Sequence, residues 1–388
     1  MKKAILITFG TLIVLGVIGV WAYLFTYGAP KNSGEVFARF GLGNNSNTEV
    51  VPVPVNDPAT IDVTGKTDTG KIQKLRQLTT RPVAGAVFRD SGILYTEQGT
   101  GHVYMINLDD GKETLVNGTT LAQSTEAVFS ADGSYVAITS YKSSGNTVAV
   151  EKVSMEGGEK EGIMLPIGAT EVAFGKASNT VMYLLKEKGG AVGYSYNLLK
   201  QSSARLFSIP LRDVRVLWGT PTYVYTTPTA RAVGFIYRME GSTLSYVTEG
   251  GYALMGLPYS GGVAVSKIDN EDVQSFTVPL KGELVNFPVS LIPEKCVSFI
   301  KIFYCASPNK RIDTATFPDS WYKGVISYSD ILWLIDSTTG NATVLSNFLS
   351  ESGREVDVSK IGIDDAGKRL YFVNKNDNTL WMFDMTIK

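Results

Sequence analysis

The sequence has little charge and almost no histidine, and both shortages exclude classes of function. Lysine and arginine number 36 against 37 aspartates and glutamates, so the formal net charge is −1. A nucleic-acid-binding protein needs a basic face to neutralise phosphates, and this balance offers no such surplus. The single histidine, His102, excludes zinc sites built from several imidazoles. We therefore expect no nucleic-acid partner, no metal and no cofactor.

Cysteine is scarce as well, with only Cys296 and Cys305 in the stretch LIPEKCVSFIKIFYCASP. Both lie in or beside short strand-like runs, which places them across a hairpin or on neighbouring strands. The compartment expected for this part of the chain, outside the cytoplasm, permits oxidation. We expect a disulfide between them, with two buried free thiols as the alternative.

Long uncharged runs are absent apart from one, at the N-terminus. Lys2 and Lys3 precede residues 4–27, which are 24 residues without a charge. At about 1.5 Å of rise per residue, such a helix spans the hydrocarbon core of a bilayer. A cleaved signal peptide is disfavoured, because a cut after residue 29 would put Tyr27 at −3 and Pro30 at +1. We predict a single-pass anchor in the cytoplasmic membrane, with the N-terminus inside and the rest of the chain outside.

The following segment, residues 28–70, has the composition of a linker. It is rich in Gly, Asn, Pro, Thr and Ser and contains VVPVPVNDP, which favours an extended spacer. The predicted organisation is therefore a cytoplasmic tip and anchor (residues 1–27), a linker (28–70) and one large domain (71–388).

A repeated unit fills that domain. Its clearest copies read AVFRDSGILYTEQG, AVFSADGSYVAITS and KIGIDDAGKRLYFV, each with two strand-like runs joined by a turn that contains Asp and Gly. Phe88, Phe129 and Phe174 open successive units at steps of 41 and 45 residues. Four-stranded propeller blades repeat every 40–45 residues or so. The sequence predicts an all-β fold, a β-propeller of seven blades, with six or eight left open.

Closure of the ring should involve the start of the domain. The stretch KIQKLRQLTT, residues 71–80, precedes the first full unit, and the last unit ends abruptly at the C-terminus. We expect this stretch to supply a strand to the last blade, because closure removes exposed sheet edges.

The units FSADGSYVAI and IDDAGKRLYF resemble the blade motif of TolB-type and WD-repeat-like bacterial propellers. The later stretch IPEKCVSFIKIFYCASPNKRIDTATFPDSWYKGVISYSDILWLID is similar to a signature of membrane-anchored propellers of unknown role in candidate-phylum bacteria. The resemblance implies the fold and carries no assigned chemistry. The His and Trp-Asp pairs of eukaryotic WD repeats are absent.

The best candidate for a binding site is an insertion in the sixth unit, ASPNKRIDTATFPDSWYKG, which is longer than any other connection. Aromatic and arginine side chains on a loop are typical of protein or glycan recognition. The alternative is that its aromatic rings cap the blade as core. The candidate binding residues are Lys310, Arg311, Phe317, Asp319, Trp321 and Tyr322.

No catalytic motif occurs. The sequence has no G-x-S-x-G nucleophile elbow, and a Ser-His-Asp triad would depend on His102, which lies in a turn before a strand. We expect a non-catalytic recognition or scaffolding module of the cell envelope, with a protein or glycan partner. The alternative is a carbohydrate- or peptidoglycan-processing enzyme with two carboxylates in the propeller channel, since that chemistry needs no histidine.

Overall fold

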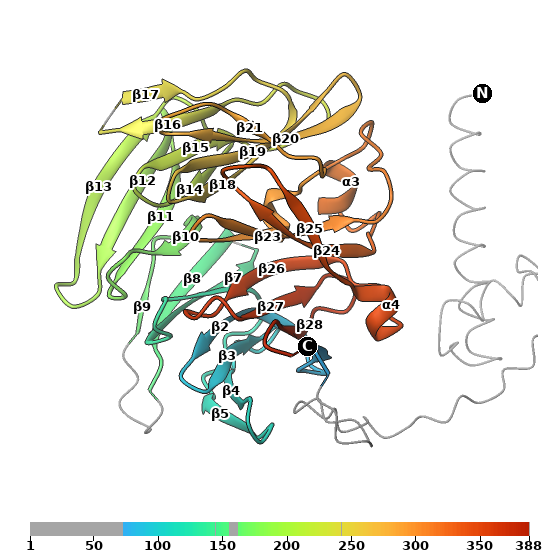
Figure 1. Cartoon of the computed structure of the whole chain (residues 1–388). Coiled ribbons are helices and arrows are strands. Elements are labelled where there is room, and N and C mark those ends of the chain that lie inside the picture. The colour runs from blue at the N-terminus through green and yellow to red at the C-terminus, as the bar shows by residue number, and fades with distance from the viewer. Residues whose placement is uncertain (1–72, 144, 155–161, 242, 388) are drawn as a thin grey trace, which may run out of the picture. The chain divides into compact units, whose positions relative to one another are not determined.

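The structure is a computed structural model that describes residues 73–143, 145–154, 162–241 and 243–387. In these ranges, 28 strands form seven four-stranded antiparallel sheets. Figure 1 shows the sheets arranged radially as the blades of a ring. The all-β, seven-bladed propeller predicted from the repeat is confirmed. No helix in the described ranges is long and apolar enough to cross a bilayer; the predicted anchor (residues 4–27) lies outside them, as does the linker (28–70).

The blades follow the sequence units in order. Blade 1 comprises β2 (Val83–Arg89), β3 (Gly92–Glu97), β4 (Val103–Asn107) and β5 (Glu113–Asn117), and blade 2 comprises β6 (Ser124–Phe129), β7 (Tyr135–Lys142), β8 (Gly145–Lys152) and β9 (Gly162–Met164). Blade 3 comprises β10 (Thr170–Phe174), β11 (Thr180–Glu187), β12 (Gly190–Asn197) and β13 (Ser202–Ile209), and blade 4 comprises β14 (Val214–Leu217), β15 (Thr222–Thr226), β16 (Ile236–Glu240) and β17 (Thr243–Tyr246). Blade 5 comprises β18 (Tyr252–Tyr259), β19 (Gly262–Asp269), β20 (Asp272–Pro279) and β21 (Val285–Asn286). Blade 6 comprises β22 (Cys296–Phe299), β23 (Ile302–Pro308), β24 (Asp330–Asp336) and β25 (Ala342–Asn347). Blade 7 comprises β26 (Val358–Ile363), β27 (Arg369–Asn374), β28 (Thr379–Asp384) and β1 (Leu75–Gln77). Three short helices, η1 (Pro293–Lys295), α3 (Asp319–Tyr322) and α4 (Phe348–Ser352), lie between strands.

The ring closes as the sequence predicted. The strand β1 pairs antiparallel with β28, with Leu75 opposite Phe383 and Gln77 opposite Trp381, so it completes blade 7. Residues from the two ends of the domain therefore share one sheet, and Leu75 is buried in the same core cluster as Phe383.

The first strand of each blade is the innermost, because these strands contact one another from blade to blade (β2 with β6, β6 with β10, β18 with β22, β22 with β26). Several of them have a β-bulge near their start, and Glu171 and Lys360 lie there with φ of 50° and 49°. A bulge inserts one residue and redirects its side chain relative to the ladder. Charged side chains are thus presented at one end of the inner strands.

The insertion between β23 and β24, residues 309–329, covers that same end and is called the cap from here on. In an antiparallel blade, the start of the first strand and the turn between the second and third strands lie at one end. Phe317 and Trp321 of the cap pack in one cluster with Ala253, at the start of β18, and Ile268, near the end of β19. We call this end of the ring the capped face, and the other end the opposite face.

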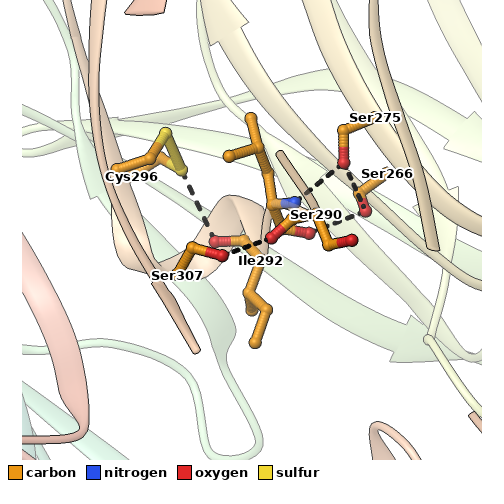
Figure 2. Close-up of a disulfide and its surroundings, with 8 residues drawn as sticks. Ser266, Ser275, Ser290, Ile292, Cys296 and Ser307 are labelled. Carbon is orange, nitrogen blue, oxygen red and sulfur yellow. Dashed lines mark hydrogen bonds between the residues drawn. A yellow bond between two sulfur atoms is a disulfide. The ribbon is translucent and has the colours of Figure 1, made fainter. Parts of the chain in front are cut away.

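Serine hydroxyls hold the buried segment that leads into η1. Ser266 Oγ donates to the carbonyl of Leu291 at 2.7 Å, and Leu291 N–H donates to Ser275 Oγ at 2.9 Å. From blade 6, Ser307 Oγ donates to the carbonyl of Ser290 at 2.6 Å (Figure 2). Since buried backbone groups need partners, these contacts fix the crossing from blade 5 to blade 6.

Cys296 and Cys305 form a disulfide beside that segment (Figure 2). They face each other directly in the β22–β23 hairpin, with their Cα atoms 4.1 Å apart. The predicted disulfide is confirmed. It fastens the first two strands of blade 6 at the point where η1 joins β22.

Candidate functional site

Of the two interpretations of the aromatic rings of the cap, exposed anchors or core, the burial of Phe317 and Trp321 favours core. Phe317 and Trp321 are only 2% and 3% exposed. Their burial is explained by the apolar cluster they join and by the hydrogen bond from Trp321 Nε1 to Asp357 Oδ2 at 3.0 Å. These two residues are therefore core, and they cannot offer a recognition surface.

Asp319 and Tyr322 dock the cap onto other parts of the ring. The carboxylate of Asp319 accepts a hydrogen bond from the backbone N–H of Ala230 at 2.7 Å and another from Thr229 Oγ1 at 3.0 Å. Backbone and hydroxyl donors hold the pKa of Asp319 below its usual value. Tyr322 donates from its hydroxyl to Glu294 at 2.6 Å. Asp319 thus fixes the cap to blade 4, and Tyr322 fixes it to η1.

Lys310 and Arg311 are exposed, as a binding role requires. They line a cavity of about 330 Å³ between blades 5 and 6, the blade 5–6 cleft. Arg311 Nη2 contacts Asp272 Oδ1 at 2.7 Å and the carbonyl of Glu271 at 3.4 Å. Arg311 thus also supports the β19–β20 turn, whereas the ammonium of Lys310 has no partner among the residues that the structure describes.

A second cavity lies on the other side of the same cap segment. It measures about 800 Å³, lies between blades 4 and 5, and is called the blade 4–5 cleft. Its lining includes the exposed carboxylates of Glu249, Asp269 and Glu271, and the ring of Tyr252, which is 44% exposed. The two clefts share Glu271, so the rim of the cap carries one continuous hollowed surface with basic and acidic parts.

The capped-face end of the inner strands holds an ion-pair network that the sequence analysis missed. Arg215 Nη1 lies 3.0 Å from Glu171 Oε1, and Nη2 lies 3.6 Å from Glu294 Oε1. The backbone N–H of Val216 also donates to Glu171, at 3.1 Å. Two carboxylates from different elements, those of Glu171 and Glu294, therefore converge on the guanidinium of Arg215. Glu294 also accepts the hydrogen bond from the hydroxyl of Tyr322.

Burial and charge shift the pKa values of three groups in this network, Glu294, Arg215 and Tyr322. Burial raises the pKa of Glu294, although Arg215 and the hydrogen bond from Tyr322 oppose the rise. Burial lowers the pKa of Arg215, but the two glutamates outweigh it and the net shift is upward. Burial and the nearby Glu294 raise the pKa of Tyr322. Arg215 therefore stays charged, and burial makes Glu294 easier to protonate than an exposed glutamate.

An open pocket of about 360 Å³ adjoins the network at blades 2 to 4 and is lined by Glu126, Glu171, Arg215 and Trp218, among others. A signal for these residues existed in the repeat. Glu126 and Glu171 each lie three positions before the phenylalanine that ends their inner strand, and Lys360 lies three positions before Ile363, which ends β26. Arg215 lies two positions before Leu217, the end of β14. Within the described ranges, no cluster of three or more His, Cys, Asp or Glu side chains is arranged to hold a metal ion.

Solved structures of other proteins have a similar fold. The β-propeller domain of the Trilobed protease from Pyrococcus furiosus matches with a TM-score of 0.53 at 9% identity, over 78% of this chain and 93% of that one. Oligogalacturonate lyase from Vibrio parahaemolyticus matches with a TM-score of 0.53 at 10% identity, over 83% of this chain and 96% of that one. The likeness shows the fold alone.

The TolB resemblance is not settled by these comparisons. A TolB-like protein from Agrobacterium tumefaciens matches over 54% of this chain and 81% of its own, at 16% identity and a TM-score of 0.37, and we draw nothing from that score. No family model matches the chain, and no curated protein matches it. The propeller fold that the resemblance implied is present.

Proposed function

We propose that this chain is a membrane-tethered recognition module that displays a rigid propeller outside the cytoplasmic membrane and binds a protein or glycan of the cell envelope on its capped face. The tether rests on the uncharged run at residues 4–27. Recognition rests on the closed ring, which holds loop side chains on a fixed scaffold.

One observation carries the proposal most strongly. Two adjoining cavities of about 330 and 800 Å³ flank the cap, in the size range of binding clefts. They present Lys310 on one side and the carboxylates of Glu249 and Asp269 on the other, with Tyr252 between the blades. Exposed charges of both signs beside an aromatic ring suit a polar partner, and the buried rings of the cap keep the surface rigid.

A second function, the carboxylate-based enzyme, is supported by a different observation. Glu171 and Glu294 converge on Arg215 at an open pocket, and the pKa of Glu294 is raised. Glycosidases use two carboxyl groups, and the one that acts as the acid has a raised pKa. Against it, Arg215 and the hydroxyl of Tyr322 already engage Glu294, which leaves it less free to reach a substrate.

The experiment that separates the two uses isolated cell-wall polysaccharide and peptidoglycan. A binder co-sediments with one of them and releases no soluble fragments, and the charge reversals Lys310→Glu and Asp269→Lys reduce the bound fraction at least severalfold. An enzyme releases fragments at a rate that Glu171→Gln and Glu294→Gln abolish. Asp90→Lys, in the β2–β3 turn of the opposite face, is the matched control and should change neither readout.

The orientation has its own test. A protease added outside intact cells that lack any outer layer should release the propeller, since linkers are cleaved and closed propellers resist. Release only by protease on the cytoplasmic side would contradict the proposed topology.

A further inference from the structure

Three ionisable side chains at the base of the cap are sealed from solvent. Lys295 ends η1, Asp330 begins β24, and Asp357 lies just before β26; all three are 0% exposed. Lys295 Nζ lies 2.8 and 3.0 Å from the two carboxylate oxygens of Asp330. It lies 2.5 Å from Asp357 Oδ1. One amine thus faces two carboxyl groups in a fully buried site.

Burial disfavours the ionised form of Asp330, and two aromatic rings face the ammonium of Lys295. The centroids of the Trp321 and Tyr328 rings are 5.2 and 5.0 Å from Lys295 Nζ, and the apolar cap cluster lies around them. Buried charges are costly, and an ion pair in the interior gains back only part of that cost. A reaction that removes one ammonium and one carboxylate would remove the cost of burying these two charges.

We propose that Lys295 and Asp330 condense to an amide bond between their side chains, with Asp357 as the catalytic residue that carries the protons. The placement supplies what the reaction needs, because an amine held against a carboxyl group reacts with an effective concentration far above any attainable in solution. Asp357 is fixed for its task by donors from Trp321 Nε1 at 3.0 Å, Ser327 Oγ at 3.1 Å and Tyr328 N at 3.2 Å.

The step balances without any further reactant. Asp357 takes one proton from the Lys295 ammonium and passes it to the Asp330 carboxylate, which gives a neutral amine and a neutral acid. The amine nitrogen then attacks the carboxyl carbon of Asp330, forming the C–N bond. A second proton leaves the nitrogen through Asp357 to the departing hydroxyl, the C–O bond breaks, and one water molecule is released. The three ammonium protons end as the amide N–H and the two protons of water, and Asp357 ends as it began.

The two carboxyl groups suit these different roles. Burial, opposed by Lys295, raises the pKa of Asp330 to about 6, so its protonated, electrophilic form is accessible near neutral pH. The backbone N–H of Val358 donates to Asp330 Oδ2 at 2.7 Å, where negative charge develops during the attack. In the product, that N–H holds the amide oxygen and the amide N–H faces Asp357, so no buried polar group is left without a partner.

The position of the bond indicates that it would stabilise the attachment of the cap to the ring. It would join residues 295 and 330 and so enclose β22, β23 and the whole cap in one covalent loop. The disulfide of Cys296 lies at the next residue. The cap, which bears the rims of both clefts, would then be fastened at its two ends.

Mass spectrometry of the full-length chain, reduced and denatured, tests the proposal. We expect the intact mass to fall below the sequence mass by one water molecule in essentially every molecule. Tryptic digestion should give a branched peptide in which Lys295 is uncleaved and joined to Asp330. Water loss through a cyclic imide at Asp110–Gly111 or Asp132–Gly133 is distinguished because it gives only linear peptides.

Variants assign the roles. Asp330→Ala and Asp357→Asn should both show the full sequence mass, whereas Asp330→Asn should form the same branched product by releasing ammonia. The matched control is Lys267, a buried lysine whose ammonium donates to the carbonyls of Glu249 and Gly250 and whose peptides should stay linear. Wild-type protein with the full sequence mass and a Lys295 that trypsin cleaves would overturn the proposal. A branch at Asp357 would overturn the assignment of Asp330.

Discussion

Trp321 offers the sharpest test of whether the cap is a structural element or a surface loop. Its ring is 3% exposed, and its Nε1 donates to the buried carboxylate of Asp357. Truncating a buried Trp to Ala costs about 3–5 kcal/mol. Leaving a buried charged acceptor short of a donor adds about 1–3 kcal/mol. Because such terms overlap, we expect Trp321→Ala to lower the free energy of unfolding by about 5 kcal/mol.

A graded series makes the measurement specific. Trp321→Phe keeps most of the packing and loses the donor, so it should cost about 2 kcal/mol. Tyr322→Phe removes only the hydroxyl on Glu294 and should cost about 1 kcal/mol. Val325→Ala, in the same cap but at a side chain that is 74% exposed, should change stability by less than about 0.5 kcal/mol. Urea unfolding of the full chain in detergent measures all four. A cost below about 1 kcal/mol for Trp321→Ala would refute the assignment of Trp321 to the core.

Three further outcomes follow from the fold. Replacing Cys296 and Cys305 together by Ser should lower the unfolding free energy by about 2–3 kcal/mol, which a urea titration with and without reductant measures, since the bridge closes a short loop. Leu75→Ala should cost about 2–5 kcal/mol because it loosens the strand that closes the ring, and cleavage near the N-terminus of the domain by added protease should then accelerate. Asp319→Asn should destabilise the chain at pH 7, because the amide N–H of Ala230 and its neighbours hold the pKa of Asp319 below its unfolded value. The loss of unfolding free energy caused by Asp319→Asn should shrink as the pH falls below about 4 towards the folded pKa of Asp319. An equal loss at pH 7 and pH 3 would contradict this prediction.

Much of the fold could be predicted from the sequence because the propeller repeats itself. The spacing of Phe88, Phe129 and Phe174 gave the period, and the abrupt end of the last unit indicated that residues near Leu75 close the ring. The disulfide was predictable because Cys296 and Cys305 flank one short hairpin. These features depend on local patterns, which a single sequence displays.

The site was harder to predict because it depends on which residues meet across the ring. From the sequence, Phe317, Trp321 and Tyr322 could be either exposed anchors or core. A long insertion on a propeller can fold back and bury its rings, and two of these three are core. Glu171 and Arg215 come from different blades, and nothing in their local sequence shows that they pair. Both residues lie at the start of the inner strand of their blade, and this was the only sequence signal we found for the pairing. It can be recognised only after the repeated units have been aligned.

The central claim is that the capped face is where this propeller meets its partner, and site-specific photo-crosslinking in intact cells tests it most directly. A photoreactive side chain is placed at Lys310 or Asp269, beside the two clefts, and at Asp90 or Asn341 in turns of the opposite face. We predict discrete crosslinked species from Lys310 and Asp269, with none from the two control positions. The same species at equal yield from Asp90 and Asn341, or species from those positions alone, would contradict the claim.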